Sequence, residues 1–228
     1  MTPDAVMIFA AGFGTRMGVL TADRPKPMIP VAGRPLIDHA LDIARAANPA
    51  RIVVNTHYKA EVLHAHLANQ DVRISHEADA ILDTGGGLKQ ARDLLDSACV
   101  YTLNPDVIWR GPNPLHLLAE GWQWGDMDAL LLCVPTARAI GRLGPGDFST
   151  SPDGRISRGG DLVYTGAQIL KPALLDRLHE RAFSLNALWD LLIAEGRASL
   201  VEYPGQWCDV GRPEGIPLAE SLLAGADV

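Results

Sequence analysis

Residues 6–33 read VMIFAAGFGTRMGVLTADRPKPMIPVAG, and this stretch decides the fold. Its first five residues, Val6–Ala10, form a short apolar run of the kind that is typical of a buried parallel strand. The run passes into a loop that contains Gly12, Gly14 and Gly18. Glycine allows positive φ angles and the close approach of a ligand. The stretch therefore predicts a strand whose carboxyl end opens on a glycine-rich binding loop.

The composition of this loop suits phosphate. Consecutive backbone N–H groups in such a loop form a concave anion site, and Arg16 adds a planar guanidinium that matches phosphate oxygens. Lys26 is a second cation, held between two prolines. Neither the Rossmann fingerprint nor the Walker A motif matches, because the third glycine is one residue late and no Gly-Lys-Ser/Thr occurs. An ordinary glycine-rich surface loop is the alternative, which the two cations disfavour.

The bulk composition limits the class of protein. The chain has 228 residues, of which 47% are hydrophobic, and this is enough for one sizeable α/β domain. Its net charge of −7 disfavours a nucleic-acid-binding protein, which usually presents a basic face. The N-terminus does not resemble a signal peptide, and no apolar run is long enough to span a bilayer. We therefore expect a cytoplasmic protein that binds neither nucleic acid nor membrane.

Strand and helix patterns alternate along the chain. Apolar runs predict the main strands at residues 6–10, 51–55, 72–76, 99–103, 129–134 and 162–169. Periodicity and start signals predict helices at residues 35–47, 60–67, 88–95, 172–178, 186–195 and 214–223. This order predicts a single α/β domain over residues 1–228, with a Rossmann-like, mixed but mainly parallel sheet and helices on both faces.

A glycine-rich segment interrupts this alternation at residues 135–165. We expect it to be an insertion on the substrate side of the domain, with short hairpin strands at residues 147–149 and 155–157. Two further short strands are expected at residues 200–203 and 207–209.

Two aspartates follow strand-like runs. Asp106 lies just past the strand expected at 99–103, and Asp209 ends the short strand at 207–209. Ligands of open parallel sheets bind beyond the carboxyl ends of the strands. Mg²⁺ prefers a few carboxylates together with substrate phosphate oxygens. The pair therefore indicates a magnesium site, although either aspartate alone is more often a turn residue.

Two motifs resemble the signature of a known family, the sugar-1-phosphate nucleotidyltransferases. They are Ala10-Ala11-Gly12-x-Gly14-Thr15-Arg16-Met17 and Pro25-Lys26-Pro27-Met28. The resemblance covers nearly the whole chain, with further matches at Thr84-Gly85-Gly86, Asp106 and Trp207-Cys208-Asp209-Val210-Gly211. Within the family, the short length, Asn55-Thr56-His57-Tyr58 and Gly146-Asp147-Phe148 are most similar to the N-acetylmuramate 1-phosphate uridylyltransferases of bacterial cell-wall recycling. The C-terminal β-helix of longer family members is not expected.

The resemblance implies an activity. A nucleoside triphosphate and a sugar 1-phosphate would give a nucleotide sugar and pyrophosphate, with Mg²⁺ as the cofactor, in a monomer or small homo-oligomer. The implied catalytic residues are Arg16, Lys26 and Asp106. The implied nucleotide-binding residues are Ala10, Ala11, Gly12, Gly14, Thr15, Glu77, Thr84 and Gly85. The implied sugar-binding residues are Asp147, Thr165, Gly166 and Asn186, and the implied metal ligands are Asp106 and Asp209.

Several points stay open at this stage. Pro105 stands where the family usually has a small residue before the metal-binding aspartate, and His57 has no partner pattern that favours catalysis over a structural role. The substrates could be UTP with N-acetylmuramate 1-phosphate, GTP with mannose 1-phosphate, or dTTP with glucose 1-phosphate. A non-catalytic nucleotide-sugar-binding subunit is the alternative of another class. The lactyl carboxylate of a muramate substrate would need a cation, for which Arg142, Arg155 and Arg158 are candidates.

Overall fold

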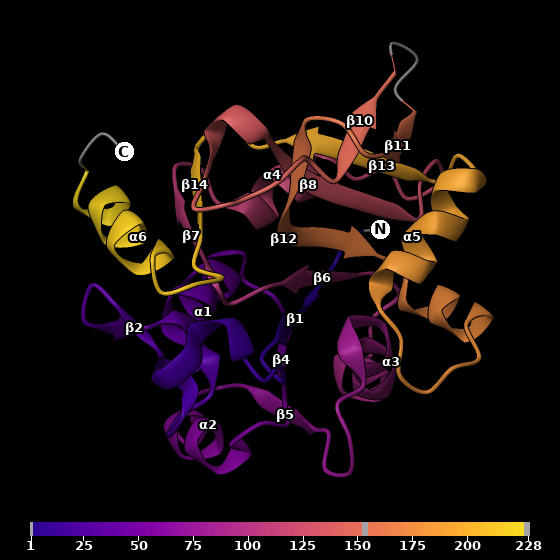
Figure 1. The fold of residues 1–228 in the computed structure, drawn as a ribbon. Coiled ribbons are helices and arrows are strands. Elements are labelled where there is room, and N and C mark those ends of the chain that lie inside the picture. Colours follow the sequence, from indigo (N-terminus) through magenta and orange to yellow (C-terminus); the bar gives the residue numbers. More distant parts are fainter. Residues whose placement is uncertain (1, 152–154, 226–228) are drawn as a thin grey trace.

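A parallel sheet forms the centre of the computed structural model, which describes residues 2–151 and 155–225 (Figure 1). Strand β1 (Ala5–Phe9) lies between β4 (Arg51–Thr56) and β6 (Val100–Leu103) and is parallel to both. Ile8 of β1 pairs with Val54 on one side and with Leu103 on the other. Strand β5 (Arg73–His76) continues the parallel part beyond β4.

The other half of the sheet is mixed. Strand β12 (Leu162–Leu170) runs antiparallel to β6 and to β8 (Ala129–Pro135), and β13 (Ala198–Glu202) is parallel to β8. The expected hairpin in the glycine-rich segment is present as β10 (Phe148–Thr150) and β11 (Ile156–Arg158), which extend the sheet beside β12. The predicted mixed, mainly parallel sheet is therefore confirmed.

Helices cover both faces of the sheet, as predicted. On one face α1 (Leu36–Ala46), α2 (Ala60–Leu67) and α4 (Pro114–Gly121) share a buried apolar cluster with Val6 and Ile8 of β1. On the other face α3 (Asp83–Leu95) and α5 (Leu185–Ala194) pack with Ala5 and Met7. Figure 1 shows α1 and α2 on one side of the parallel strands and α3 on the other. Among the described residues, no helix is both long and apolar enough to span a bilayer.

A small separate sheet completes the fold. Its strands are β7 (Val107–Arg110), β14 (Gln206–Asp209) and β9 (Ala139–Ile140), with β14 in the middle. Helix α6 (Gly215–Ala224) packs on this sheet in a third apolar cluster that contains Ile108 and Cys208. Neither β7 nor α4 was expected from the sequence.

Other segments are short. The glycine-rich loop leads into the 3₁₀ segment η1 (Thr15–Thr21), Lys26 opens η2 (Lys26–Met28), and the helix expected at 172–178 is the 3₁₀ helix η4 (Pro172–Arg177). The remaining elements are the two-residue strands β2 (Pro30–Val31) and β3 (Arg34–Pro35) and the 3₁₀ turn η3 (Thr136–Arg138).

Helix α3 begins earlier than the sequence predicts. It starts at Asp83, so Gly85, Gly86 and Gly87 lie inside its first turns and do not form a turn before residue 88. These glycines are required by close packing. A Cβ at Gly86 would overlap the Arg181 carbonyl oxygen, and a Cβ at Gly87 would lie 2.6 Å from Oε1 of Glu77.

This packing predicts whether a Gly→Ala substitution in α3 raises or lowers the free energy of unfolding. In an ordinary helix, Gly→Ala stabilises by about 1 kcal/mol through helix propensity. We expect Gly86→Ala instead to lower the free energy of unfolding by roughly 2 kcal/mol, because the new methyl group meets backbone that must shift. The measurement is urea unfolding. Gly121→Ala in α4 is the control, since its Cβ would meet only the end of the Leu130 side chain at 3.2 Å; equal effects of the two substitutions would contradict this account.

Candidate active site

A cavity of about 390 Å³ lies at the carboxyl ends of the parallel strands. Phe9 ends β1, Asn55 lies near the end of β4, Glu77 follows β5 and Asn104 follows β6, and all four line the cavity. This is the position at which open α/β sheets bind ligands.

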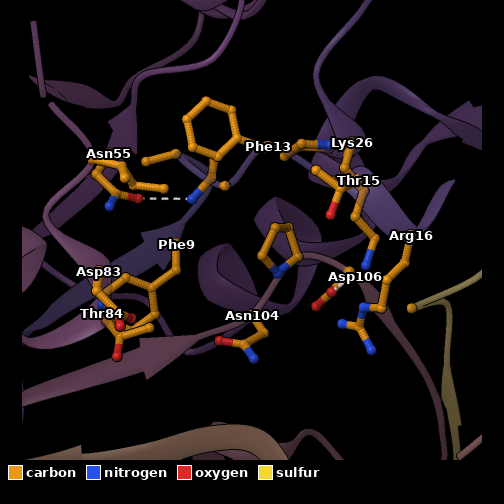
Figure 2. A pocket seen from close by; sticks show the side chains of 18 of the residues that line it. Phe9, Phe13, Thr15, Arg16, Lys26, Asn55, Asp83, Thr84, Asn104 and Asp106 are labelled. Atoms are coloured by element: carbon orange, nitrogen blue, oxygen red, sulfur yellow. Dashed lines mark hydrogen bonds and ion pairs between the residues drawn. The ribbon is translucent and has the colours of Figure 1, made fainter. Parts of the chain in front are cut away.

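Most of the predicted site residues meet here. Those that line the cavity are Ala10, Ala11, Gly12, Gly14, Thr15, Arg16, Lys26, Glu77, Thr84 and Asp106. The cavity has two ends: Figure 2 shows Arg16, Lys26 and Asp106 at one end and Asn55 and Thr84 at the other. The predicted residues that line neither this cavity nor the adjoining one are Gly85, Thr165, Gly166 and Asp209.

The glycine-rich loop presents its backbone to the cavity. Gly14 has a φ of 65°, and a Cβ there would lie 2.8 Å from Cβ of Lys26, so this position requires glycine for conformation and for space. Within residues 2–151 and 155–225, the N–H groups of Gly12, Phe13 and Gly14 have no hydrogen-bond acceptor. Successive N–H groups of this kind form an anion-binding concavity. The sequence-based interpretation of the loop therefore agrees with its geometry.

Charged side chains converge at one end of the cavity. Nζ of Lys26 forms an ion pair with Oδ2 of Asp106, and both side chains are largely buried. Burial opposes ionisation of Asp106, but the attraction of Lys26 and its hydrogen bond outweigh burial and hold the pKa of Asp106 below its usual value. Arg16 is exposed on the cavity wall and has no ion-pair partner among the described residues. Its guanidinium is therefore available to a ligand.

The small sheet brings the two aspartates together. Asp209 pairs with Val107 across β14 and β7, and the Val210 N–H donates to the Asp106 carbonyl at 2.9 Å. Burial raises the pKa of Asp209, and the negative charge of Asp106 raises it further. A cation between two such carboxylates would relieve this repulsion.

The residues present fit a magnesium ion. Gly211 lines the cavity, and a Cβ there would lie 2.8 Å from Oδ1 of Asp209, so a side chain at this position of the wall would collide with the carboxylate. The described residues contain no group of three or more His, Cys, Asp or Glu side chains that could enclose a metal. Mg²⁺ needs only one or two carboxylates and takes its other ligands from water and substrate phosphates.

Pro105 does not displace Asp106 from the site. The backbone is held on both sides of the proline, because the Asn104 N–H donates to Gly166 at 2.9 Å and the Asp106 carbonyl accepts from Val210. Pro105 itself lines the cavity. The departure from the family pattern is therefore accommodated by the surrounding chain.

A buried polar network forms the other end of the cavity. Asn55 accepts from the Ala10 N–H at 2.7 Å and donates to Oε1 of Glu77 at 2.7 Å, while Oε2 of Glu77 accepts from the Leu82 N–H at 2.7 Å. His57 donates through Nδ1 to the Glu77 carbonyl at 2.6 Å, in agreement with a structural role. Asn55 and Glu77 are only 3% and 2% exposed. The network therefore fixes the positions of three strand ends.

The first turn of α3 is also occupied by protein contacts. The N–H groups of Gly85 and Gly86 donate to the Phe183 carbonyl at 2.9 and 3.2 Å. The Thr84 hydroxyl accepts from the Leu185 N–H at 2.9 Å. Gly85 therefore lies behind the wall, where its lack of a side chain makes room for the Phe183 ring, and its N–H is not directed at the cavity.

A second cavity of about 250 Å³ adjoins the first. The two share Phe9, Asp83, Thr84 and Asn104. Of the predicted sugar-binding residues, Asp147 and Asn186 line this second cavity. The other members of its wall include Arg158, Tyr164, Gln168 and Trp189.

Thr165 and Gly166 lie outside the walls of both cavities. The Thr165 hydroxyl is fully buried and donates to the Leu132 carbonyl at 2.6 Å, and the Thr165 carbonyl accepts from the Trp207 indole at 3.0 Å. Trp207 is therefore a core residue. Gly166 has a φ of 89°, and a Cβ there would lie 2.8 Å from Cβ of Asn104. It lets β12 approach Asn104 closely.

Sequence reasoning missed several residues of the cavity walls, among them Asn104 and Phe13. Asn104 lines both cavities, and its place directly after a predicted strand was the signal that could have found it. Phe13 is 45% exposed on the wall of the first cavity and makes edge-to-face contacts with His57 and Tyr58 at 5.5 and 5.7 Å. Its position between two loop glycines was the corresponding signal.

Comparison with known proteins agrees with this geometry. The family model of the MobA-like NTP transferase domain matches residues 6–200. The chain belongs to this family. It is an enzyme of the sugar-1-phosphate nucleotidyltransferase class, as the resemblance of its motifs predicted.

Several relatives of this nucleotidyltransferase are informative. It is 39% identical to the N-acetylmuramate alpha-1-phosphate uridylyltransferase of Caulobacter vibrioides, over 98% of each chain. It is 28% identical to a mannose-1-phosphate guanyltransferase of Hypocrea jecorina, over 91% of this chain and 61% of that protein. Its fold matches a UDP-glucose pyrophosphorylase crystallised with UDP-glucose, with a TM-score of 0.79 and 17% identity over 99% of each chain.

The polar network of this nucleotidyltransferase generates a prediction. In Asn55→Ala, the buried Ala10 N–H and one oxygen of Glu77 lose their partners. A buried polar group without a partner costs about 1–3 kcal/mol, so we expect the free energy of unfolding to fall by roughly 3 kcal/mol. Urea unfolding is the measurement.

Asn104→Ala is the matched control for this substitution. Asn104 also lines the cavity, but its side chain makes no hydrogen bond to the described residues. Its truncation should cost less than about 1 kcal/mol. If both variants were equally stable, the network would not be what holds the strand ends.

Proposed function

We propose that this enzyme transfers the uridylyl group of UTP to N-acetylmuramate 1-phosphate and releases pyrophosphate. The 39% identity to the Caulobacter vibrioides uridylyltransferase over 98% of both chains carries this proposal. The guanyltransferase is less similar, and this chain spans only 61% of its length. Mannose 1-phosphate with GTP is therefore the second candidate, and glucose 1-phosphate with dTTP is the third.

The charged end of the first cavity would hold the triphosphate. The free N–H groups of the loop would bind phosphate oxygens, and Arg16 would bind the leaving β- and γ-phosphates as a bidentate fork. Lys26 would stabilise charge at the α-phosphate from its position beside Asp106. Such groups act by positioning the reactants and by neutralising charge.

The acceptor needs little activation. The second pKa of a phosphate monoester is about 6, so the sugar phosphate is an anion at neutral pH and attacks without a general base. Asp106 and Asp209 would hold Mg²⁺, which is consistent with the general dependence of this family on divalent metals. When bound, the metal would neutralise phosphate charge and orient the oxygens.

The other end of the first cavity would hold the base, and the adjoining cavity the sugar. Asn55, Glu77 and Thr84 line the base side, while Asp147 and Asn186 line the sugar side. Both cavities are lined by one chain. Each subunit would therefore carry a complete site, whether the protein is a monomer or a small homo-oligomer. Because UTP is an intracellular substrate, we place the reaction in the cytoplasm.

The metal assignment predicts a loss of turnover. Asp209→Asn removes one of the two carboxylates, and we expect kcat to fall by about a thousandfold at saturating Mg²⁺, which corresponds to several kcal/mol of charge stabilisation. Steady-state pyrophosphate release measures turnover, and paramagnetic Mn²⁺ titration with nucleotide measures metal binding directly. Asp176→Asn, on a surface ion pair with Arg92, is the control. Near wild-type turnover and Mn²⁺ affinity in Asp209→Asn would show that this residue is not a ligand.

The substrate assignment predicts a preference for UTP over GTP. We expect kcat/KM with N-acetylmuramate 1-phosphate to be higher with UTP than with GTP by about a hundredfold or more, because a site of fixed donors and acceptors rejects a base that leaves them unpaired. The measurement is pyrophosphate release for four sugars (N-acetylmuramate, N-acetylglucosamine, glucose and mannose 1-phosphates), each with UTP, dTTP and GTP. A higher kcat/KM for mannose 1-phosphate with GTP would overturn the muramate proposal and leave the nucleotidyltransferase class intact.

A further inference from the structure

The second cavity contains a single cationic side chain among the described residues that line it. Its charged members are Asp83, Asp147 and Arg158. Both oxygens of Asp147 are already engaged, since Oδ1 accepts from Arg142 at 3.1 Å and Oδ2 accepts from the Tyr164 N–H at 2.9 Å. The positive charge of Arg158 is therefore the feature of this cavity that can select a negatively charged substituent.

The Arg158 guanidinium is held in a fixed orientation. Nε donates to Oδ1 of Asp190 at 2.7 Å, and Nη2 donates to the Asn186 carbonyl at 3.0 Å. The guanidinium also lies 4.9 Å from the ring centre of Phe148 and 5.4 Å from that of Trp189. These contacts restrain the side chain before any ligand binds, which lowers the entropic cost of using it in recognition.

Part of this guanidinium remains available. An arginine has five N–H donors, and Nη1 of Arg158 makes no hydrogen bond to the described residues. The side chain is 36% exposed, and its partner Asp190 is 62% exposed. Asp190 is thus well solvated, so the pair neutralises Arg158 only weakly.

The two other arginines of the glycine-rich segment are placed differently. Arg142 is committed to Asp147 and does not line the cavity. Arg155 lies at the hairpin tip, where its carbonyl accepts from the Ser151 N–H at 2.9 Å, and it is also absent from the wall. Arg158 alone of the three reaches the cavity.

We propose that Arg158 is the specificity-determining residue that binds a carboxylate carried by the sugar. This inference rests on the proposed function, because the cavity is assigned to the sugar through that function. N-acetylmuramate 1-phosphate and N-acetylglucosamine 1-phosphate differ only by the lactyl ether with its carboxylate. Arg158 therefore distinguishes these two sugars and leaves their shared parts to other residues.

The test compares the two sugars on three proteins: wild type, Arg158→Gln and Arg177→Gln. Arg177 forms the same kind of surface pair, with Glu195, away from both cavities. Binding of each sugar phosphate is measured by calorimetry and kcat/KM by pyrophosphate release. Because Asp190 is solvated, Arg158→Gln should fold, and its urea unfolding is measured alongside.

We expect the wild type to bind N-acetylmuramate 1-phosphate more tightly than N-acetylglucosamine 1-phosphate. In Arg158→Gln, the affinity and kcat/KM for the muramate should fall by about 10- to 100-fold, mainly through a higher KM. The values for N-acetylglucosamine 1-phosphate should change less than about threefold. Arg177→Gln should match wild type, and Arg158→Lys should recover part of the selectivity by restoring the charge.

Two results would overturn the inference. One is that Arg158→Gln weakens both sugars equally, which would make Arg158 a structural support of the cavity. The other is that the variant keeps the wild-type preference for the muramate, or that wild type has none. A wild-type protein that binds the muramate selectively through Arg158 but fails to use UTP would overturn the proposed reaction and leave this inference standing.

Discussion

The pairing of β1 with parallel strands on both sides is the constraint on which the rest of the structure depends. It buries the first four residues of β1, so their alternate side chains must meet apolar helices on both faces of the sheet. It also places the ends of β1, β4 and β6 at one edge. The chain leaves β1 there as the glycine-rich loop, which is thus the floor of the cavity.

A second constraint follows from the first. The strand ends leave backbone N–H groups that have no ladder partner, and burial without a partner is costly. Asn55 meets this need at Ala10, directly after β1, and Glu77, directly after β5, accepts from the N–H of Leu82, the residue that precedes α3. The hydrogen bond between Asn55 and Glu77 joins these positions through side chains. The carboxylate of Glu77 is thereby a structural group as well as part of the wall. The hydrogen bonds to both of its oxygens explain why this side chain is tolerated at 2% exposure.

The sequence predicted what is local and failed where distant segments meet. The β1 run and its loop are contiguous, so their pattern alone indicated both the strand and an anion site. Gly85 was implied to bind the nucleotide, but Phe183, almost a hundred residues later, occupies its space and accepts from its N–H. Thr165 and Trp207 bond to each other across the core, and no local pattern contains that contact. Strand β7 is short, and its pairing with β14 is equally non-local.

The Lys26–Asp106 ion pair affects which ions can bind at this end of the cavity. Each member satisfies the other, so a lone anion that binds Lys26 must take it away from Asp106 and leave a largely buried carboxylate uncompensated. A lone cation that binds Asp106 must likewise take it away from Lys26 and leave the largely buried ammonium group uncompensated. A solute that brings both signs of charge together offers each member a new partner at once. At this pair, a complex of phosphate and metal is therefore favoured over either ion alone, because it compensates both charges in one binding event.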